Sequence, residues 1–433
     1  MSKFFKLFII FIFITNCSFH KNSKFWSKKE IIVKQDVVNK KIFEKADIVE
    51  LEFNPNLKIT LSAKPINNSF INNLDNNNGR INYNGNLQNV SKYKFSRIKN
   101  FYQYDPKIIF NKNKIIFFDN KGSILNFDNK GNLIWKKNYY TKADQKQNPI
   151  LFFANDKNIL IITDNISKFY GLDINTGELL WSKKNSAPFN SQIKIHQDKF
   201  FAIDFENVLR AYSIKNGKEI WNLKTHSALI RSQKKLSMII INEKIYFNNS
   251  LGDISSADVI TGEMIWQTPT QSNLVYDEGY FLKTSDIIAD KKSLYFSNNK
   301  NQFFSLDLQS GMLNWKQKVN SNLRATLIDE YLFTVSKEGY LIIIEKKSGN
   351  IIRVNDIFNS IKKNKRANIE PTGFIVGKKN IYLSTSHGKL LEIDILSGKT
   401  KSIIKIDNKK ISRPLVSNQD LFIITDDSII RLN

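Results

Sequence analysis

The chain has 433 residues, a formal net charge of +25 and a single cysteine. A chain of this length is too long to fold around one ordinary hydrophobic core, so it indicates either several domains or one closed array of repeats. The single cysteine excludes an intrachain disulfide. The scattered lysines, without an RNA-binding signature or a long basic helix, argue against a nucleic-acid-binding protein, but leave open a solvated basic surface or an anionic partner.

Residues 1–16 have the pattern of a secretory signal peptide. Lys3 and Lys6 precede the apolar run Leu7–Ile14, which suits a signal-peptide core and is too short to cross a bilayer. The next letters, ITNC, resemble the lipobox of bacterial lipoproteins and end at Cys17. This resemblance implies export and lipidation of Cys17; an ordinary leader with an incidental cysteine is the alternative.

Residues 17–85 differ in composition from the rest of the chain. They are rich in asparagine and lysine and include the run NNSFINNLDNNNG. We interpret them as a lipidated N-terminal tether, partly extended against the domain that follows.

From residue 86 onward, the chain repeats a phrase in which a turn glycine is followed four residues later by a tryptophan. LDINTGELLW (Leu172–Trp181) is one copy, and five of the six tryptophans stand in such copies. The last two copies, IEKKSGNIIR and IDILSGKTKS, have lost the tryptophan. The marker glycines recur with a mean period of about 44 residues, which is typical of propellers and other repeat arrays. They are Gly131, Gly177, Gly217, Gly262, Gly311, Gly349 and Gly398.

Each repeat contains the pattern of four short strands. In Ile159–Lys184 the segments ILIIT, KFYGLD and ELLWSKK are separated by turns, and Pro149–Ala154 supplies a fourth strand. Four-stranded antiparallel sheets with this period are typical of propeller blades. We expect the aspartates four residues before the turn glycine, Asp173, Asp258, Asp307 and Asp394, to accept backbone amide hydrogens; blade three has Ser213 there instead. We expect the tryptophan ring to pack between neighbouring sheets.

The two ends of the repeat region predict how the ring closes. After the seventh phrase, Pro414–Ser417, Leu421–Thr425 and Ser428–Leu432 match three strands of another blade. Val90–Ile98 alternates like an outer strand, so it can supply the missing fourth strand and remove an exposed edge. We therefore predict an all-β, eight-bladed β-propeller over residues 86–433, with the last blade closed by N- and C-terminal strands; seven blades is the alternative.

No motif for catalysis, metal binding or cofactor binding appears in the sequence. The four histidines are isolated, and no zinc-type pair, nucleophile elbow, P-loop or dinucleotide fingerprint is present. Spacing alone leaves open an acid pair assembled across the central channel. The histidines are His20, His196, His226 and His387.

The repeat phrase resembles two groups of proteins. DINTGELLW (Asp173–Trp181) and DVITGEMIW (Asp258–Trp266) resemble the repeat of quinoprotein dehydrogenases, which use pyrroloquinoline quinone (PQQ) and also have eight blades. Those enzymes are longer and typically have a vicinal cysteine disulfide, calcium ligands and a catalytic aspartate. The lipobox-like cysteine, short tether, eight repeats and doubly closed last blade together are more similar to the BamB family of outer-membrane lipoproteins.

The BamB resemblance implies a non-enzymatic scaffold without a cofactor, anchored in the outer membrane and facing the periplasm. Members bind the POTRA domains of BamA, the barrel-forming subunit, within the assembly machinery and assist the insertion of unfolded outer-membrane proteins. Their partner-binding loops join blades three to four and four to five. Here these loops read SALIRS and KTSDII, so the resemblance assigns partner binding to Leu229, Ile230, Arg231 and Asp286.

Two other functions remain open at this stage. A PQQ-dependent dehydrogenase-like quinoprotein would show a quinone absorbance. An exported propeller that binds glycan or another ligand would bind isolated peptidoglycan or sugar.

Overall fold

The computed structural model describes residues 51–67, 73–99, 101, 106–225, 232, 234–270 and 282–433. These residues belong to one compact unit, Asp47–Asn433. The predicted leader, Cys17, and the predicted loop residues Leu229, Ile230 and Arg231 lie outside the described residues.

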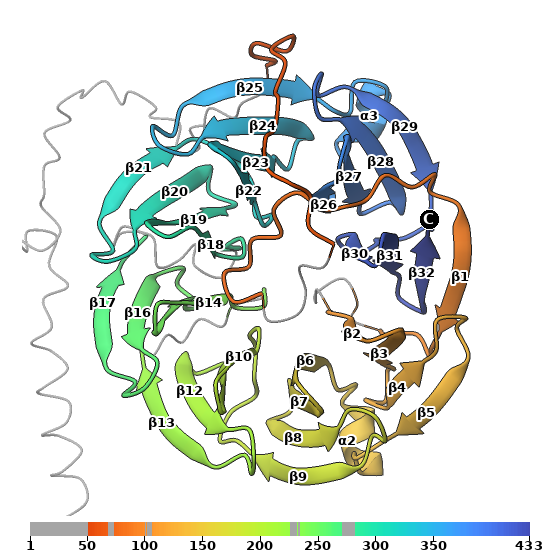
Figure 1. The fold of residues 1–433 in the computed structure, drawn as a ribbon, viewed down its shortest axis with the longest axis vertical. Helices are drawn as coiled ribbons and strands as arrows, with labels where there is room; N and C mark the ends of the chain where they lie inside the picture. Colours follow the sequence, from red (N-terminus) through yellow and green to blue (C-terminus); the bar gives the residue numbers. More distant parts are fainter. Residues whose placement is uncertain are drawn as a thin grey trace, which may run out of the picture. The chain divides into compact units, whose positions relative to one another are not determined.

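Eight four-stranded antiparallel sheets form a ring in this unit, with the first strand of each blade nearest the centre (Figure 1). Blades one to four consist of β2 (Ile109–Asn111), β3 (Lys114–Phe118), β4 (Ile124–Phe127) and β5 (Leu133–Lys137); β6 (Leu151–Asp156), β7 (Ile159–Asp164), β8 (Lys168–Asp173) and β9 (Leu179–Lys184); β10 (Lys194–His196), β11 (Lys199–Ile203), β12 (Val208–Ser213) and β13 (Glu219–Lys224); and β14 (Met238–Ile241), β15 (Lys244–Asn248), β16 (Ile254–Asp258) and β17 (Met264–Thr268).

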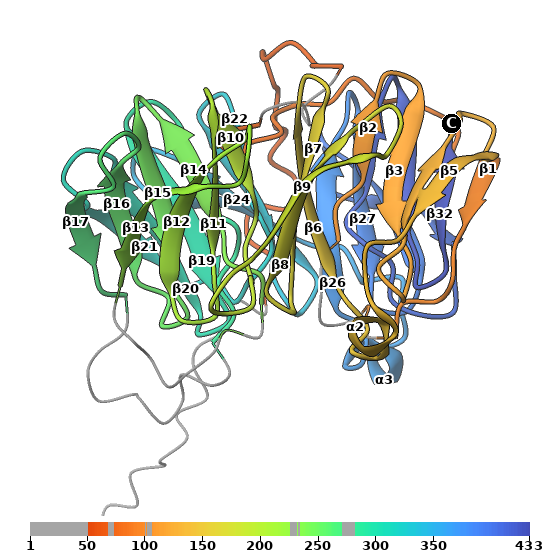
Figure 2. The ribbon, with the colours of Figure 1, turned by 90° about the horizontal axis from the view of Figure 1, so that it is seen from below.

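Blades five to seven continue the same order. They consist of β18 (Ile288–Ala289), β19 (Ser293–Asn298), β20 (Gln302–Asp307) and β21 (Leu313–Gln317); β22 (Thr326–Ile328), β23 (Tyr331–Val335), β24 (Tyr340–Glu345) and β25 (Ile351–Asp356); and β26 (Pro371–Val376), β27 (Asn380–Thr385), β28 (Lys389–Asp394) and β29 (Thr400–Lys405). Two short helices, α2 (Lys142–Lys146) and α3 (Lys363–Arg366), lie on one face of the ring (Figure 2).

The eighth blade contains strands from both ends of the repeat region, as predicted. It is formed by β30 (Leu415–Ser417), β31 (Asp420–Ile424), β32 (Ser428–Leu432) and β1 (Asn89–Lys94), with β1 antiparallel to β32. Gln88 and Asn433 also exchange two backbone hydrogen bonds, of 2.9 and 3.0 Å. The ring therefore closes without leaving β32 as an exposed edge, and the prediction of eight blades is confirmed.

The hydrophobic core lies between adjacent blades. Phe201 and Leu209 of blade three, for example, share one buried cluster with Ile245 and Phe247 of blade four. Alternate residues of each strand therefore pack against one of the two neighbouring blades, so that the sheets stabilise one another around the ring.

The tryptophan of each of the first five blades packs on the turn glycine of the next blade. The Trp181 indole donates a hydrogen bond to the Ile214 carbonyl (2.9 Å), and a Cβ added to Gly217 would lie 2.6 Å from the Trp181 ring. Gly217 has φ of +66°, so both its backbone and the close contact require glycine. The equivalent pairs are Trp135 with Gly177, Trp221 with Gly262, Trp266 with Gly311 and Trp315 with Gly349.

The aspartates that precede four of the turn glycines have the predicted role. Asp173 Oδ1 accepts hydrogen bonds from the backbone amides of Asn175 (2.8 Å) and Thr176 (2.9 Å). Asp258 makes the same contacts to Ile260 and Thr261, at 2.8 Å each. These bonds fix the turn that presents the glycine to the preceding blade.

An arginine replaces the tryptophan at the seam between blades six and seven. Arg353 is fully buried and donates hydrogen bonds to the carbonyls of Ile395 (2.9 Å) and Leu396 in the next blade, and of Leu57 (2.9 Å) in the tether. Burial lowers the pKa of Arg353 to about 10. The tether therefore completes a seam that the repeat itself no longer seals.

Candidate functional site

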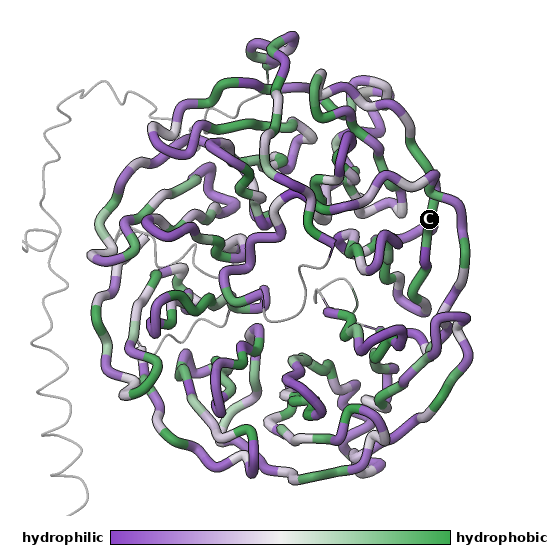
Figure 3. Tube along the Cα trace, viewed as in Figure 1, coloured by the Kyte–Doolittle hydropathy of each residue, from purple (hydrophilic) through white to green (hydrophobic). Residues whose placement is uncertain are grey.

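Part of the predicted tether lies across the centre of the ring instead of merely along its surface. Residues 73–80 cross the hub as a mostly hydrophilic segment (Figures 1 and 3). Asn76 is buried there, and its amide donates hydrogen bonds to Gln192 Oε1 (3.1 Å), the Met238 carbonyl (3.2 Å) and the Ile287 carbonyl (2.9 Å). One side chain thus joins blades three, four and five. We call residues 73–80 the hub segment.

Further contacts extend the hub segment to blades six and seven. The Asn77 side chain and the Leu327 backbone exchange two hydrogen bonds, of 3.1 and 3.0 Å, and Ile240 donates to the Leu74 carbonyl (3.0 Å). Arg80 forms a parallel bridge with Val376 of β26. The segment therefore occupies the side of the hub that faces blades three to seven.

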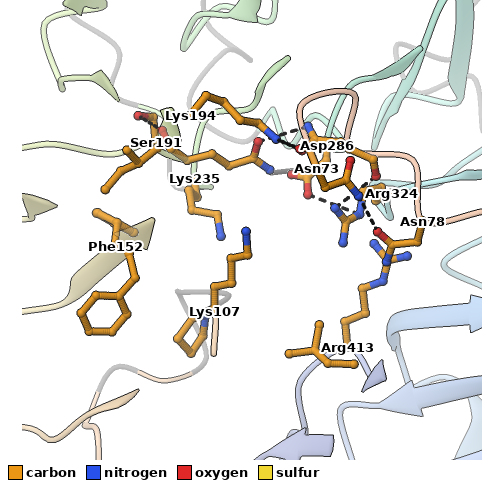
Figure 4. Close-up of a pocket in the computed structure, with 16 residues that line it drawn as sticks. Asn73, Asn78, Lys107, Phe152, Ser191, Lys194, Lys235, Asp286, Arg324 and Arg413 are labelled. Carbon is orange, nitrogen blue, oxygen red and sulfur yellow. Dashed lines mark hydrogen bonds and ion pairs between the residues drawn. The ribbon is translucent and has the colours of Figure 1, made fainter. Parts of the chain in front are cut away.

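Two cavities lie in the hub beside the hub segment, and both are lined by Lys235, Asp286, Arg324 and Arg413. The first is also lined by residues of blades one, two and eight (Figure 4), and the second has a volume of about 350 Å³. We call the two together the hub cavity. Its cationic lining residues are Lys107, Lys194, Lys234, Lys235, Lys283, Arg324, Lys410 and Arg413. Among the described lining residues, the carboxylates are Asp286 and Glu370.

Asp286, which the sequence assigns to partner binding, lies in this cavity just before β18. Its side chain is 13% exposed, and its Oδ2 lies 3.7 Å from Arg324 Nε. Burial acts to raise the pKa of this carboxyl, but Arg324, Lys234 and nearby lysines outweigh burial, so the pKa lies below its ordinary value. A partner would have to reach into the hub to contact Asp286, and the role of this residue in partner binding stays a prediction.

Two lysines of the hub cavity have pKa values below the ordinary value for lysine. Burial, followed by repulsion from Arg324 and Lys235, lowers the pKa of Lys107 to about 8. Lys194 also has a lowered pKa because of its burial and the charges of Lys107 and Arg324, although its amino group donates to Asn73 and Asn76 of the hub segment. The cavity therefore concentrates like charges at short range.

Arg413 places an unsatisfied guanidinium in the same cavity. Its Nε donates to the Phe374 carbonyl (2.8 Å), while its two terminal nitrogens are buried without a hydrogen-bond partner. Arg413 is only 6% exposed. Gly373 makes room for it, because a Cβ there would lie 2.5 Å from the Arg413 Cβ. The backbone thus holds one end of the guanidinium, and the other end is enclosed without a hydrogen-bond partner.

The described residues contain no cluster of side chains that could bind a metal ion. No three histidine, cysteine or carboxylate side chains of these residues lie close enough to hold a metal ion. His196 lies 3.0 Å from Glu243, and His387 lies 3.1 Å from Ser386, so each of these two histidines has a local partner. Within the described residues, no helix is long and apolar enough to cross a membrane.

Comparison with known sequences decides the family. The sequence profile of the family described as "Outer membrane protein assembly factor BamB" matches residues 120–355, which is more than half of the chain. The chain belongs to the BamB family. A search of curated proteins found no match. Among solved structures, BamB from Moraxella catarrhalis has a TM-score of 0.66 at 15% identity and covers 80% of this chain and 99% of that chain.

Two dehydrogenases of known structure are also similar to this chain in fold. The quinohemoprotein alcohol dehydrogenase from Comamonas testosteroni matches with a TM-score of 0.61 at 10% identity, covering 82% of this chain and 78% of that chain. A europium-containing methanol dehydrogenase matches with a TM-score of 0.61 at 11% identity, covering 79% of this chain and 86% of that one. At such identities the likeness to all three structures shows the fold alone.

The hub of this BamB-family chain does not fit the site expected of a PQQ enzyme. That site typically combines a vicinal cysteine pair with calcium-binding carboxylates, whereas Cys17 is the only cysteine of the chain. Asp286, one of the two carboxylates that line the described hub cavity, lies against Arg324. We therefore derive no reaction step through a quinone.

The charged residues of the hub have a sequence signal that motif reading missed. Lys107, Asp286, Arg324 and Arg413 each stand two residues before the innermost strand of their blade, namely β2, β18, β22 and β30. Residues at this shared position approach one another only because the ring closes. Charged residues at the same offset in separate repeats could have identified them.

Proposed function

We propose that this BamB-family chain is a non-enzymatic scaffold subunit of the outer-membrane β-barrel assembly machinery. The observation that carries the proposal is the match to the BamB family across blades one to six of an eight-bladed ring. The absence of a recognisable catalytic motif in the sequence agrees with it. In this role the protein binds the periplasmic POTRA domains of the BamA subunit and assists the assembly and insertion of outer-membrane proteins.

The partner contact is assigned to loops that leave neighbouring blades. Leu229, Ile230 and Arg231 belong to the connection between β13 and β14, and Asp286 precedes β18. A rigid ring holds the ends of such loops at fixed spacing, and an arginine flanked by apolar side chains can bind a carboxylate of a partner.

The N-terminus gives the proposed location. Signal-peptide cleavage and lipidation of Cys17 would anchor the protein in the outer membrane, facing the periplasm, through the tether. Metabolic labelling with a fatty-acid analogue tests this step: the wild-type chain should carry the label and Cys17→Ser should not. An unlabelled wild-type chain would contradict the anchor.

An affinity pull-down from solubilised outer membranes tests the partner. The wild-type protein should retain a POTRA-containing barrel protein, and Arg231→Glu should lose most of it. Lys130→Glu is the matched control, because Lys130 is exposed in a turn of blade one and undergoes the same change of charge. Failure of the wild-type protein to retain any barrel-assembly subunit would refute the scaffold role.

The same preparation distinguishes the dehydrogenase alternative. A quinoprotein would show a quinone absorbance and alcohol- or sugar-dependent reduction of a dye, whereas the scaffold shows neither. Binding to isolated peptidoglycan, without a retained barrel protein, would instead favour a glycan-binding propeller.

A further inference from the structure

The tether is fixed to the ring where it meets the seam between blades six and seven. Phe53 and Val354 exchange two backbone hydrogen bonds, of 3.2 and 2.8 Å. The side-chain amide of Asn355 donates to the carbonyls of Pro55 (3.1 Å) and Ser397 (3.3 Å), and so joins the tether to the turn between β28 and β29. The backbone of the tether and of this turn is therefore held in place by β25.

Four apolar side chains are exposed at this junction. Leu51 and Phe53 stand at the start of the described tether. Arg353 donates to the carbonyls of Leu57, in the tether, and Leu396, in the β28–β29 turn, so these two residues lie beside each other. The exposed fractions are 80% for Leu51, 50% for Phe53 and Leu396, and 43% for Leu57. Single exposed apolar residues are common, but several gathered at one fixed place mark an interaction site. We call these four residues the apolar junction.

The apolar junction lies on one face of the ring. The red start of the described chain projects there beyond the blades, on the face opposite to α2 and α3 (Figures 1 and 2). Leu396 agrees with this position, because the β28–β29 turn lies at the start of an outer strand, whereas the connection to the next blade leaves from the other end. The connection between β13 and β14, which is proposed to contact BamA, leaves its outer strand at that other end. The junction and the proposed partner contact therefore lie on opposite faces.

The course of the chain indicates what covers the apolar junction, and this step rests on the proposed lipidation of Cys17. A chain as long as residues 18–50 spans at most roughly 120 Å, at about 3.6 Å per residue. An anchor on so long a connection would hold the ring near the bilayer without choosing the part of the ring that meets it. It would also give the junction a high effective concentration at the membrane surface, so that even a weak apolar contact is populated.

We propose that the apolar junction inserts into the interfacial region of a phospholipid bilayer, as a second membrane contact besides the lipid anchor. Its apolar side chains enter the boundary between headgroups and acyl chains, while its backbone stays hydrogen-bonded to the ring. Lys58 and Lys399 are exposed and follow Leu57 and Leu396 closely in sequence, where they suit the phosphates of the surrounding headgroups. The loops assigned to BamA then face away from the bilayer, so both contacts can be made at once.

Flotation with vesicles tests this contact without the anchor. The parent protein is the chain without its predicted leader, residues 17–433, with Cys17→Ser in place of the lipidation site. It should float with vesicles of phosphatidylethanolamine and phosphatidylglycerol, and the double variant Leu51→Ser/Phe53→Ser should bind about tenfold more weakly, which corresponds to about 1.4 kcal/mol. Leu180→Ser is the matched control, since this leucine is 52% exposed on the outer strand of blade two, and it should leave binding unchanged.

The same proteins give the results that would overturn the proposal. Absence of flotation by the parent protein would do so, and so would equal weakening by the double variant and by Leu180→Ser. A dimer of the parent protein in light scattering, dispersed by the double variant, would assign the junction to a second copy of the chain and reject the membrane. Both substituted side chains are exposed, so the thermal melting curve of the double variant should match that of the parent.

A fluorophore reports the contact at the residue itself. With Cys17→Ser the chain has no cysteine, so Leu51→Cys accepts a single polarity-sensitive label. Its emission should shift to the blue when vesicles are added, and lipids with a spin label near the headgroup should quench it. Lys121→Cys, in the exposed turn between β3 and β4 at the opposite face, should show neither change. Unchanged emission at residue 51, or the same change at residue 121, would overturn the proposal.

The anchor and the apolar junction can fail separately. Fatty-acid labelling tests Cys17 in the wild-type chain, whereas flotation is measured without that cysteine. Labelling of Cys17 with no flotation of the parent protein would leave the proposed location intact and reject only the second contact. Flotation that depends on Leu51 and Phe53, without labelling of Cys17, would support the second contact and reject the anchor.

Discussion

The seams between blades differ in the two halves of the ring. From blade one to blade six, each seam is sealed by a tryptophan on the next turn glycine, as Trp181 is on Gly217. After blade six the phrase has lost its tryptophan, and the seam between blades six and seven depends on Arg353, with the tether carbonyl of Leu57 as an acceptor.

The tether follows the seams that the repeat no longer seals. Phe53 pairs with Val354 of blade six, and Tyr83 shares a buried cluster with residues of blades seven and eight. Beyond the tether, Tyr93 of β1 lies in the seam between blades eight and one. A repeat can therefore lose its own seal when a segment from outside the repeat supplies the missing contacts. The following predictions test this difference.

Removal of the closing strand should have the largest effect. A chain that starts at residue 95 lacks β1, so β32 becomes an exposed edge and the fully buried Tyr93 is lost. We expect loss of cooperative thermal unfolding and aggregation during size-exclusion chromatography. A monomeric chain with an unchanged melting transition would show that the ring does not need closure from both ends.

Removal of the tether alone should come second. A chain that starts at residue 86 keeps β1 but leaves Lys194 and Arg353 without some of their acceptors. Each buried polar group left without a partner costs about 1–3 kcal/mol, so the free energy of unfolding should fall by roughly 5 kcal/mol. Hydrogen exchange should accelerate most in blades six and seven. A chain that starts at residue 51 is the control and should unfold like the full-length protein.

Loss of one tryptophan should have a smaller effect, confined to its seam. Trp181→Ala removes a partly buried ring and its bond to Ile214, so the free energy of unfolding should fall by about 3 kcal/mol, the lower end of the range for a core aromatic. Gly217→Ala should act in the same direction, since its Cβ would clash with that ring. Chemical denaturation measures both changes. Faster hydrogen exchange in blades six and seven, rather than in blades two and three, would contradict the idea that each seam is stabilised by its own contacts.

The sequence predicted the repeating half of this comparison well. The period of the glycines gave the blades, and the alternation of Val90–Ile98 gave the closing strand, because both depend on local spacing. The hub segment was predicted only as a tether, since its asparagines are also typical of loops. Asn76 joins blades three, four and five through residues far away in sequence, and only closure of the ring brings them together. The cations of the hub were missed for the same reason.

The smallest expected effect concerns the charge of the hub. In the folded protein the Lys107 pKa is lowered from its ordinary value of 10.5 to about 8, by burial and by Arg324 and Lys235, despite the opposing charge of Asp286. At pH 7 the lysine is charged in both the folded and unfolded states, so the folded state carries the repulsion. Lys107→Gln should therefore raise the free energy of unfolding at pH 7 in the absence of anions.

This gain should disappear as the pH rises. Between about pH 8 and 10.5 the folded protein releases the Lys107 proton before the unfolded chain does, so the wild type gains stability relative to Lys107→Gln. Denaturation curves of both proteins at pH 7, 9 and 10.5 measure the difference. Lys130→Gln should show no such trend, because Lys130 is exposed. A constant difference across this range would mean that Lys107 affects stability through packing rather than charge. Charge repulsion would then no longer distinguish the hub from the seams.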